Sequence, residues 1–364
     1  MKKIKVYLQY PWKFPDSPYY KYLINYPPEG IEFLNIKNEG GAITKASKFK
    51  ILNSLKHQIR FWTNKLNLVM PNAHLTESKE EFDLIHCAHC LSKNNNKPWV
   101  ADLEGIWSMW ISGQRTKRGK REVKDILSRK NCKKIMPWTE SGYKEIIETF
   151  PEIKDKVELV YPAVPFFGKG KKNKKLTIIY VARQFWIKGG LIALEVLSKI
   201  KEKYDVNVIF ISDVDEKVRK AYPSIEIKGL MPQNKVFDLM SKSDVFFYPS
   251  MVDTFGFALL EAMSFGLPIL SVKTEYTKNV EEIIKEGKHG FLINIKDKPN
   301  YYKMGENEKQ IANQLYNKLS LLIENKKLRE NISKNCLNEI KTGKFSIKAR
   351  NEKYAKIYSR ALSA

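Results

Sequence analysis

Short apolar runs alternate with segments of helical periodicity along the whole chain. In the first half, the apolar runs predict strands at 4–9, 31–36, 82–87, 98–103, 133–136 and 157–161. In the second half, they predict strands at 176–182, 206–211, 225–228, 244–248, 268–272 and 290–293. Apolar residues at three- and four-residue spacing predict helices between these later strands, at 190–203, 233–242, 257–265 and 279–286. Strands that alternate with helices indicate an α/β chain with doubly wound parallel sheets.

A break in this pattern at 162–175 predicts the boundary between two domains. The segment reads PAVPFFGKGKKNKK, and its prolines, glycines and lysines cannot continue a strand or a packed helix. Three helical segments close the chain, at about 307–323, 326–341 and 346–362. We therefore expect an N-terminal Rossmann-like domain at 1–165, a C-terminal one at 166–345, and a closing helix at 346–364 that packs back toward the first domain. The two domains are expected to face a cleft, because ligands of open parallel sheets bind at the C-terminal ends of the strands.

A further helix is expected between residues 45 and 68. Its apolar positions recur at helical spacing, at Phe49, Leu52, Leu55, Ile59, Trp62 and Leu66. Such a stripe is typical of a helix that covers a sheet, which is the favoured interpretation. The alternative is a helix that lies on a membrane surface with its Phe and Trp side chains inward.

The charge of the chain is its most informative compositional feature. The 364 residues hold 64 Lys and Arg against 40 Asp and Glu, a formal net charge of +24. Such a surface attracts polyanions such as nucleic acid, anionic lipid or phosphorylated substrates, or it serves solubility alone. Hydrophobic residues make up 43% of the chain, which is enough to bury sizeable cores and excludes wholesale disorder.

Nothing in the sequence predicts export or a membrane span. No apolar run approaches the ~18 residues of a membrane helix, and the apolar stretch after the basic start ends at Pro11. Four cysteines in a chain of this length do not form a disulfide framework. We therefore expect the protein in the cytoplasm.

The densest basic stretch lies at residues 114–134. It holds ten Lys and Arg against two acidic residues. The functional interpretation is docking to anionic lipid headgroups, or to the phosphates of an acceptor. The alternative is a solvated, mobile charged loop. We slightly favour a function, because the stretch falls in the domain expected to bind the acceptor.

Two short motifs resemble metal sites, and we expect a metal at neither. His86-Cys87-Ala88-His89-Cys90 has no second ligand pair nearby, whereas zinc usually takes four ligands from two spaced pairs. Asp213-Val214-Asp215 has the form of a D-x-D metal motif but lies in the wrong domain, so a solvated loop is expected there.

The strongest chemical signal lies at residues 244–270. A predicted strand ends at Tyr248-Pro249, a loop carries Asp253, and Gly256 opens a helix that contains Glu261. The backbone N–H groups at such a helix start can hold an anion such as a diphosphate. Carboxylates beside it accept hydrogen bonds from vicinal sugar hydroxyls.

A second signal follows the first strand of the same domain, in IYVARQFWIKGG at 179–190. Arg183 and Lys188 lie in the loop after the strand, and Gly189-Gly190 lead into a helix. Two cations at the end of a strand suit a phosphate group. They would also neutralise charge on a departing diphosphate.

These two segments resemble the retaining glycosyltransferases of the GT-B fold, family 4 type, also called glycosyl transferases group 1. The family pattern R-x4-K-G appears as Arg183, Lys188 and Gly189. The pattern P-S-x-x-E-x-F-G-x-x-x-x-E-A-M-x-x-G-x-P appears from Pro249 to Pro268, with Asp253 in place of the first glutamate. The resemblance covers about residues 176–360 and implies a GT-B fold of two Rossmann-like domains.

The resemblance also implies roles for individual residues. Arg183 and Lys188 would hold the donor diphosphate, and Glu261 would bind the ribose hydroxyls. Asp253 would lie where the family's first glutamate contacts the donor sugar; it reaches one methylene less far. The backbone groups of Phe255, Gly256 and Phe257 would line the sugar and the phosphate. The family transfers its sugar with retention of configuration and without a metal or cofactor.

The N-terminal half resembles the family less closely. The strand end that carries a histidine near the transferred sugar in the family reads here as Pro98 to Gly105, with Glu104 at the histidine position. A carboxylate there would bind a sugar hydroxyl or stabilise developing positive charge. The other interpretation is that the alignment is wrong at this position.

The predicted function is transfer of a sugar from a nucleotide diphosphate-sugar to a glycan or lipid-linked acceptor. This activity belongs to polysaccharide biosynthesis, and we expect it in the cytoplasm, peripheral to the inner face of the membrane, with 114–134 as the anionic-surface contact. The base of the donor stays open among UDP, GDP and ADP, and no nucleic-acid partner is expected. The alternative is a polyanion-binding protein on a degenerate GT-B scaffold.

Overall fold

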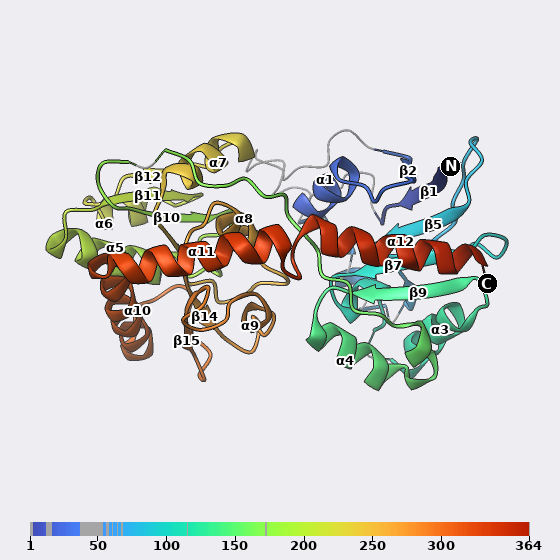
Figure 1. Cartoon of the computed structure of the whole chain (residues 1–364). Coiled ribbons are helices and arrows are strands. Elements are labelled where there is room, and N and C mark those ends of the chain that lie inside the picture. Colours follow the sequence, from blue (N-terminus) through green and yellow to red (C-terminus); the bar gives the residue numbers. More distant parts are fainter. Residues whose placement is uncertain are drawn as a thin grey trace. The chain divides into compact units, whose positions relative to one another are not determined.

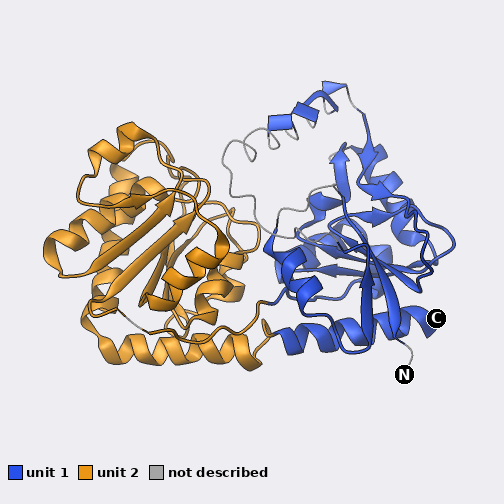
Figure 2. Cartoon of the chain, turned by 90° about the horizontal axis from the view of Figure 1, so that it is seen from above, with its two compact units in different colours: residues 1–163, 347–364 blue, residues 164–346 orange. Residues whose placement is uncertain are grey.

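The chain folds into two compact units, each with its own parallel sheet. The computed structural model describes residues 3–11, 17–36, 54–55, 58–59, 61–63, 65–66, 68–114, 116–171 and 173–363. Unit 1 comprises Met1–Ala163 together with Ile347–Ala364, and unit 2 comprises Val164–Ser346 (Figure 2).

Unit 1 is built on a parallel five-stranded sheet. Its strands are β1 (Ile4–Gln9), β2 (Ile31–Leu34), β5 (Leu84–Ala88), β7 (Trp99–Leu103) and β9 (Cys132–Pro137). Their order is β2-β1-β5-β7-β9, and every neighbouring pair is parallel. Every residue of β5 and β7 is buried, as expected for the central strands of a sheet covered on both faces.

Helices and short strands surround this sheet. The helices are α1 (Pro18–Asn25), α3 (Lys117–Ser128), α4 (Glu140–Thr149) and α12 (Ile347–Ser363), and two 3-10 helices lie at Ile106–Met109 and Pro151–Lys156. Two-stranded pairs form between β3 (Met70–Pro71) and β8 (Trp110–Ser112), and between β4 (Ala73–His74) and β6 (Leu91–Ser92). Side-chain caps fix the helix starts, since Ser17, Thr116 and Thr139 each accept a hydrogen bond from a backbone N–H in the first turn.

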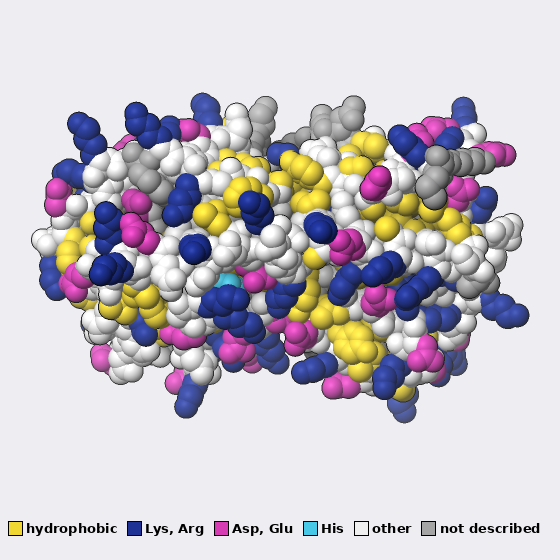
Figure 3. All heavy atoms as spheres, viewed as in Figure 1, with side chains coloured by type: hydrophobic (Ala, Val, Ile, Leu, Met, Phe, Trp, Pro, Cys, Tyr) yellow, Lys and Arg dark blue, Asp and Glu magenta, His cyan; other side chains and the backbone are white. Residues whose placement is uncertain are grey.

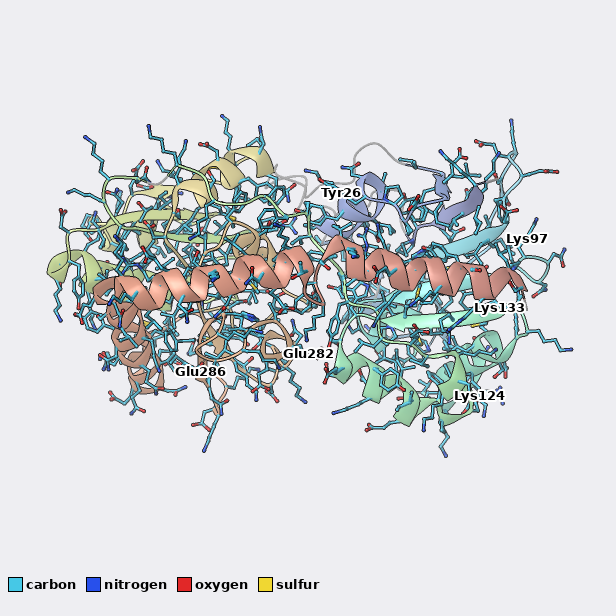
Figure 4. All side chains as sticks on the ribbon, in the orientation of Figure 1. Tyr26, Lys97, Lys124, Lys133, Glu282 and Glu286 are labelled. Atoms are coloured by element: carbon cyan, nitrogen blue, oxygen red, sulfur yellow. The ribbon has the colours of Figure 1, made fainter. Side chains whose placement is uncertain are left out.

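The C-terminal helix α12 is anchored to unit 1 by buried polar groups. It contacts β5, β7 and β9 (Figure 1). The Tyr354 hydroxyl donates to Asp102 Oδ2 at 2.5 Å, and the Tyr358 hydroxyl lies 2.5 Å from Nδ1 of His86. The Arg350 guanidinium, 2% exposed, donates to the carbonyl oxygens of Tyr22 and Tyr26, the latter labelled in Figure 4. These contacts place the last helix of the sequence with the first unit.

Unit 2 is built on a parallel six-stranded sheet. Its strands are β10 (Thr177–Ala182), β11 (Asn207–Ser212), β12 (Ile227–Lys228), β13 (Val245–Tyr248), β14 (Ile269–Lys273) and β15 (Gly290–Asn294). Their order is β12-β11-β10-β13-β14-β15. The helices are α5 (Gly190–Lys203), α6 (Glu216–Ala221), α7 (Gln233–Lys242), α8 (Phe257–Ser264), α9 (Val280–Ile283), α10 (Glu306–Glu324) and α11 (Lys326–Thr342). In this doubly wound unit α5 packs against α10, and α8 against α11.

The structure corrects two expectations about local structure. The strand expected at 157–161 does not form. Val157 bridges Ile135, and the N–H groups of Glu158 and Val160 donate to the carbonyl oxygens of Ile135 and Pro137, but this pairing stops before Pro162, which has no N–H to donate. The second concerns the alternative interpretation of the basic stretch 114–134, a mobile charged loop, which is wrong for the centre of the stretch. Its centre is α3, which buries Val123, Ile126 and Leu127 on one face and keeps its cations on the other. The sequence did not predict this helix, because its many charged residues outnumber the few apolar residues of the buried face.

The helix expected at 45–68 falls partly outside the described residues, which include neither Phe49 nor Leu52. The described positions at 54–55, 58–59, 61–63 and 65 are helical. Leu55, Ile59, Trp62 and Leu66 are nevertheless exposed, with Trp62 at 53% and Leu66 at 62%. The expectation of a core helix is therefore wrong for these side chains.

No helix among the described residues is both long enough and apolar enough to span a bilayer.

Candidate functional site

Two loops of unit 2 start from adjacent strand ends. β10 and β13 are neighbours in the sheet, with Ile178 paired to Val245. Their C-terminal ends carry the loops at 183–189 and 249–256. The loops touch through their backbones, since the Met251 N–H donates to the Ile187 carbonyl oxygen at 3.1 Å. Both loops carry residues singled out by the sequence, and the fold brings them together.

Gly189 makes this close approach possible. It adopts φ +69° at the N-cap of α5. A Cβ atom built there would lie 1.9 Å from the Pro249 carbonyl oxygen, closer than any real contact allows. Glycine therefore meets two requirements at once, a left-handed backbone and space for the neighbouring loop.

Lys188 and Asp253 form an ion pair across the two loops. Lys188 Nζ lies 3.2 Å from Asp253 Oδ2, and the two side chains are only 17% and 11% exposed. The same Nζ donates to the Val252 carbonyl oxygen at 2.7 Å and lies over the Tyr248 ring. A cation and a carboxylate with this little exposure are weakly screened by solvent, so their charges act strongly on each other and on any charge placed beside them.

Tyr248, the last residue of β13, also reaches Asp253. Its hydroxyl donates to Asp253 Oδ2 at 2.9 Å. Burial and then the negative charge of Asp253 raise the Tyr248 pKa well above its ordinary value, so the hydroxyl keeps its proton. Sequence reasoning missed this residue, because a tyrosine in an apolar strand looks like a core side chain.

The loop after β13 ends at the start of α8. Gly256 is the N-cap with φ +102°, and the carbonyl oxygen of Phe255 accepts from Asn279 Nδ2 at 2.5 Å. Phe255 is buried, and its ring lies 5.1 Å from that of Phe257. The N-terminal end of α8, with the positive end of its dipole, thus follows directly on the loop that carries Asp253.

Glu261 lies inside α8 and is 7% exposed. Its Oε1 accepts a hydrogen bond from Gln233 Nε2 at 2.9 Å, and Gln233 is the first residue of α7. The partner of this buried carboxylate therefore comes from another helix. Sequence reasoning named Glu261 but missed Gln233, because nothing local links the two positions.

The remaining predicted residues, Arg183 and Glu104, are not joined to the Lys188–Asp253 pair by the contacts described above. Arg183 follows β10 directly and is half-buried at the same strand end as the Lys188 loop. Glu104 belongs to unit 1, where it follows β7; burial, and after it the charges of Cys90 and Glu104, raise the pKa of the Tyr20 hydroxyl well above its ordinary value. Glu104 is therefore in a different unit from the other predicted residues.

Unit 1 holds a buried polar cluster that the sequence did not reveal. Asp102 Oδ2 accepts from Tyr19, Tyr354 and His86, the last at 2.9 Å, and both Asp102 and His86 are fully buried. Nearby, burial lowers the pKa of His89 to about 4. In the described parts of the chain, no group of three or more His, Cys, Asp or Glu side chains is arranged to hold a metal ion.

Comparison with known proteins points to the same segment. Residues 175–304 match the family described as glycosyl transferases group 1. This match covers about a third of the chain and lies within unit 2. The match covers the loops that carry Arg183, Lys188 and Asp253 and the helix that carries Glu261.

Curated relatives match over a similar region. A 41.2 kDa protein of the cps region of Klebsiella pneumoniae is 28% identical over 160 residues, which cover 40% of this chain and 43% of that protein. An N,N'-diacetylbacillosaminyl-diphospho-undecaprenol alpha-1,3-N-acetylgalactosaminyltransferase of Campylobacter jejuni is 26% identical over 194 residues, covering 52% of this chain and 46% of the relative. The chain spans less than half the length of the curated relatives it matches.

Solved structures extend the likeness to the whole fold. A glycosyltransferase from Rickettsia africae has a TM-score of 0.64 at 16% identity and covers 100% of this chain and 99% of its own. The chain has the GT-B fold that this group of glycosyltransferases shares. The matches give no support to a polyanion-binding protein.

Proposed function

We propose that the chain is a glycosyltransferase that moves a sugar from a nucleotide diphosphate-sugar to a glycan or lipid-linked acceptor. One observation carries the proposal: Lys188 and Asp253 meet at the adjoining ends of β10 and β13, beside the N-terminal end of α8. Cations, a helix start and a carboxylate in one place suit a sugar joined to a diphosphate.

The donor would be held by charge and by hydroxyl recognition. Arg183 and Lys188 would bind the diphosphate together with the N-terminal end of α8. Glu261, oriented by Gln233, would accept from the ribose hydroxyls, and Asp253 from a hydroxyl of the sugar. The backbone of Phe255, Gly256 and Phe257 would line the sugar and the phosphate.

Transfer would proceed with retention and without a metal, as the resemblance implies. The chemical need is to stabilise negative charge on the departing diphosphate. Arg183 and Lys188 supply two positive charges at the strand end where that charge would develop. Glu104, in unit 1, would act on the transferred sugar or on the acceptor.

The acceptor is proposed to be carried by a lipid or to be part of a polysaccharide. The Campylobacter jejuni relative is named for transfer to a sugar on diphospho-undecaprenol, and the Klebsiella pneumoniae relative is named for the cps region. An acceptor on a lipid requires the enzyme to work at a membrane face. The proposed place of action is therefore the cytoplasm, peripheral to the inner face of the membrane.

Unit 1 has a basic and apolar surface that is suited to contact with a membrane. Lys117, Lys120 and Arg121 of α3 are exposed, as is Lys124, labelled in Figure 4. The exposed apolar residues Leu68 and Met70 lie near the start of this helix, because β3 pairs with β8 and contacts α3, and Ser112 Oγ donates to the Leu68 carbonyl oxygen. Cations beside apolar side chains favour an anionic bilayer surface.

A thermal-shift panel tests the donor site. The protein is melted with UDP, GDP, ADP or duplex DNA, each with and without EDTA, alongside Arg183→Ala. We expect one nucleoside diphosphate to raise the melting temperature by several degrees despite EDTA, and the variant to lose the effect, because a ligand at 100 times its Kd adds about 2.7 kcal/mol. Stabilisation by DNA alone, abolished by salt, would reject the donor site.

A further inference from the structure

Both polar partners of the Asp253 carboxylate bind the same oxygen. The Tyr248 hydroxyl donates to Oδ2 at 2.9 Å, and Lys188 Nζ lies 3.2 Å from Oδ2. Within the described residues, Oδ1 has no hydrogen-bond partner. A carboxylate held at one oxygen keeps its second oxygen able to accept a hydrogen bond from another donor.

Tyr248 is the more rigid of the two partners. Its side chain is 4% exposed, and its ring stacks on Phe246 with the centroids 5.4 Å apart. Its backbone carbonyl oxygen accepts from Ser271 Oγ at 2.6 Å, which ties β13 to β14 at this point. The hydroxyl therefore occupies one position, set by the sheet.

Lys188, in contrast, has more than one possible partner. Its Nζ already donates to the Val252 carbonyl oxygen, and a bound diphosphate would compete with Asp253 for the remaining protons. When an anion draws Lys188 away, the Tyr248 hydroxyl is the contact that still fixes Oδ2. Tyrosine suits this task because a neutral donor is not drawn toward the phosphate as a cation is.

We propose that Tyr248 is a positioning residue: it holds Oδ2 of Asp253 so that Oδ1 faces a hydroxyl of the donor sugar. This rests on the proposed function, since it assumes a sugar nucleotide in the site. Loss of the hydroxyl leaves the fold and the diphosphate contacts in place but lets the carboxylate turn. The effect therefore falls on sugar transfer and not on nucleotide affinity.

The test measures the rate of sugar transfer and the affinity for nucleotide separately in the Tyr248→Phe variant. Release of nucleoside diphosphate is measured with UDP-glucose, UDP-N-acetylglucosamine, GDP-mannose and ADP-glucose, and the Kd of the released diphosphate is measured by calorimetry. We expect kcat to fall about tenfold or more, as for loss of a hydrogen bond to a charged group, with Kd within about twofold of wild type. In an Asp253→Asn background, Tyr248→Phe is expected to cause no further loss, because it acts through that carboxylate.

Tyr222→Phe is the matched control. It also removes a tyrosine-to-carboxylate contact from unit 2, to Glu195 Oε2 at 3.5 Å, between α5 and the end of α6. Its kcat and Kd should equal those of the wild type.

Three results would overturn the inference. They are unchanged turnover in Tyr248→Phe, a loss of affinity that matches the loss of turnover, and independent effects of the two substitutions in the double variant. If the wild type neither binds a nucleoside diphosphate nor turns over any of these donors, the proposed function itself fails, and the inference fails with it.

Discussion

At the scale of single residues, the buried polar groups of this chain are held by partners from distant segments. Asp253 is held by Tyr248 and Lys188, Glu261 by Gln233, and Asp102 by tyrosines of α1 and α12. The two carboxylates of unit 2 could be predicted from the sequence, because they are spaced around a helix start. The neutral donors Tyr248 and Gln233 could not be predicted, because neither residue belongs to a recognisable motif.

The buried side chain of His89 leads to a prediction about how the stability of the protein depends on pH. Its ring nitrogens have no hydrogen-bond partner within the described residues, and burial lowers its pKa to about 4 from an ordinary value of about 6.5. The unfolded chain therefore binds a proton more readily than the folded one. Stability should fall as pH drops from about 6.5 to about 4, by at most about 3 kcal/mol in total.

Thermal melts between pH 7 and pH 4.5 measure this effect. His89→Phe should lose the part of the pH dependence that His89 causes, so the gap between variant and wild type should change steadily across the window. His74→Gln is a second test: burial and then the charge of Lys93 also lower the pKa of His74, so this variant should lose part of the pH dependence in the same direction. Parallel curves for His89→Phe and wild type would contradict the prediction.

At the scale of elements, the site depends on two strand ends brought into register. β10 and β13 are neighbours in the sheet although they are not consecutive in the chain, so their loops meet only in the folded unit. The approach is close enough to require glycine at the start of α5. The expected strands and helices of unit 2 match observed ones to within a few residues, except that α9 is shorter than expected, and the short helix α6 was not expected.

Gly189→Ala tests this junction. Its Cβ would collide with the Pro249 carbonyl oxygen in a left-handed backbone conformation, so the two loops must separate. We expect a loss of about 1–3 kcal/mol in unfolding free energy and a clear loss of nucleoside diphosphate affinity. Gly229→Ala is the matched control, since a Cβ at that position would have no atom within 4 Å and its φ is not positive. Equal affinities in the two variants would show that the junction is not needed for binding.

At the scale of the whole molecule, charge is distributed and not confined to one region. Figure 3 shows Lys and Arg side chains scattered over both units on the face in view, with acidic side chains among them. The net charge of +24 therefore gives general attraction to anions and does not by itself mark a site. A specific docking surface needs the apolar side chains that accompany the α3 cations in unit 1.

Vesicle co-sedimentation tests that surface. With vesicles of phosphatidylcholine and phosphatidylglycerol at about 70:30, we expect binding that weakens with salt and is much weaker to phosphatidylcholine alone. Lys120→Glu with Arg121→Glu should lower the affinity at least about tenfold, since each cation near an anionic surface contributes about 1 kcal/mol. Lys309→Glu with Lys326→Glu is the charge-matched control on α10 and α11 of unit 2. Equal losses in both double variants would show that net charge alone, and not the α3 surface, causes binding.

The sequence by itself determined the class of the fold, most of its elements and the residues of the motif that resembles glycosyl transferases group 1. These features are local. The spacing of apolar residues predicts strands and helices, and a motif consists of residues that are close together in the chain. The tertiary structure alone decided that Lys188 meets Asp253, and that Tyr248 and Gln233 hold the two carboxylates. Such contacts join segments far apart in sequence, and they exist only because the packing of a whole sheet places certain strand ends side by side.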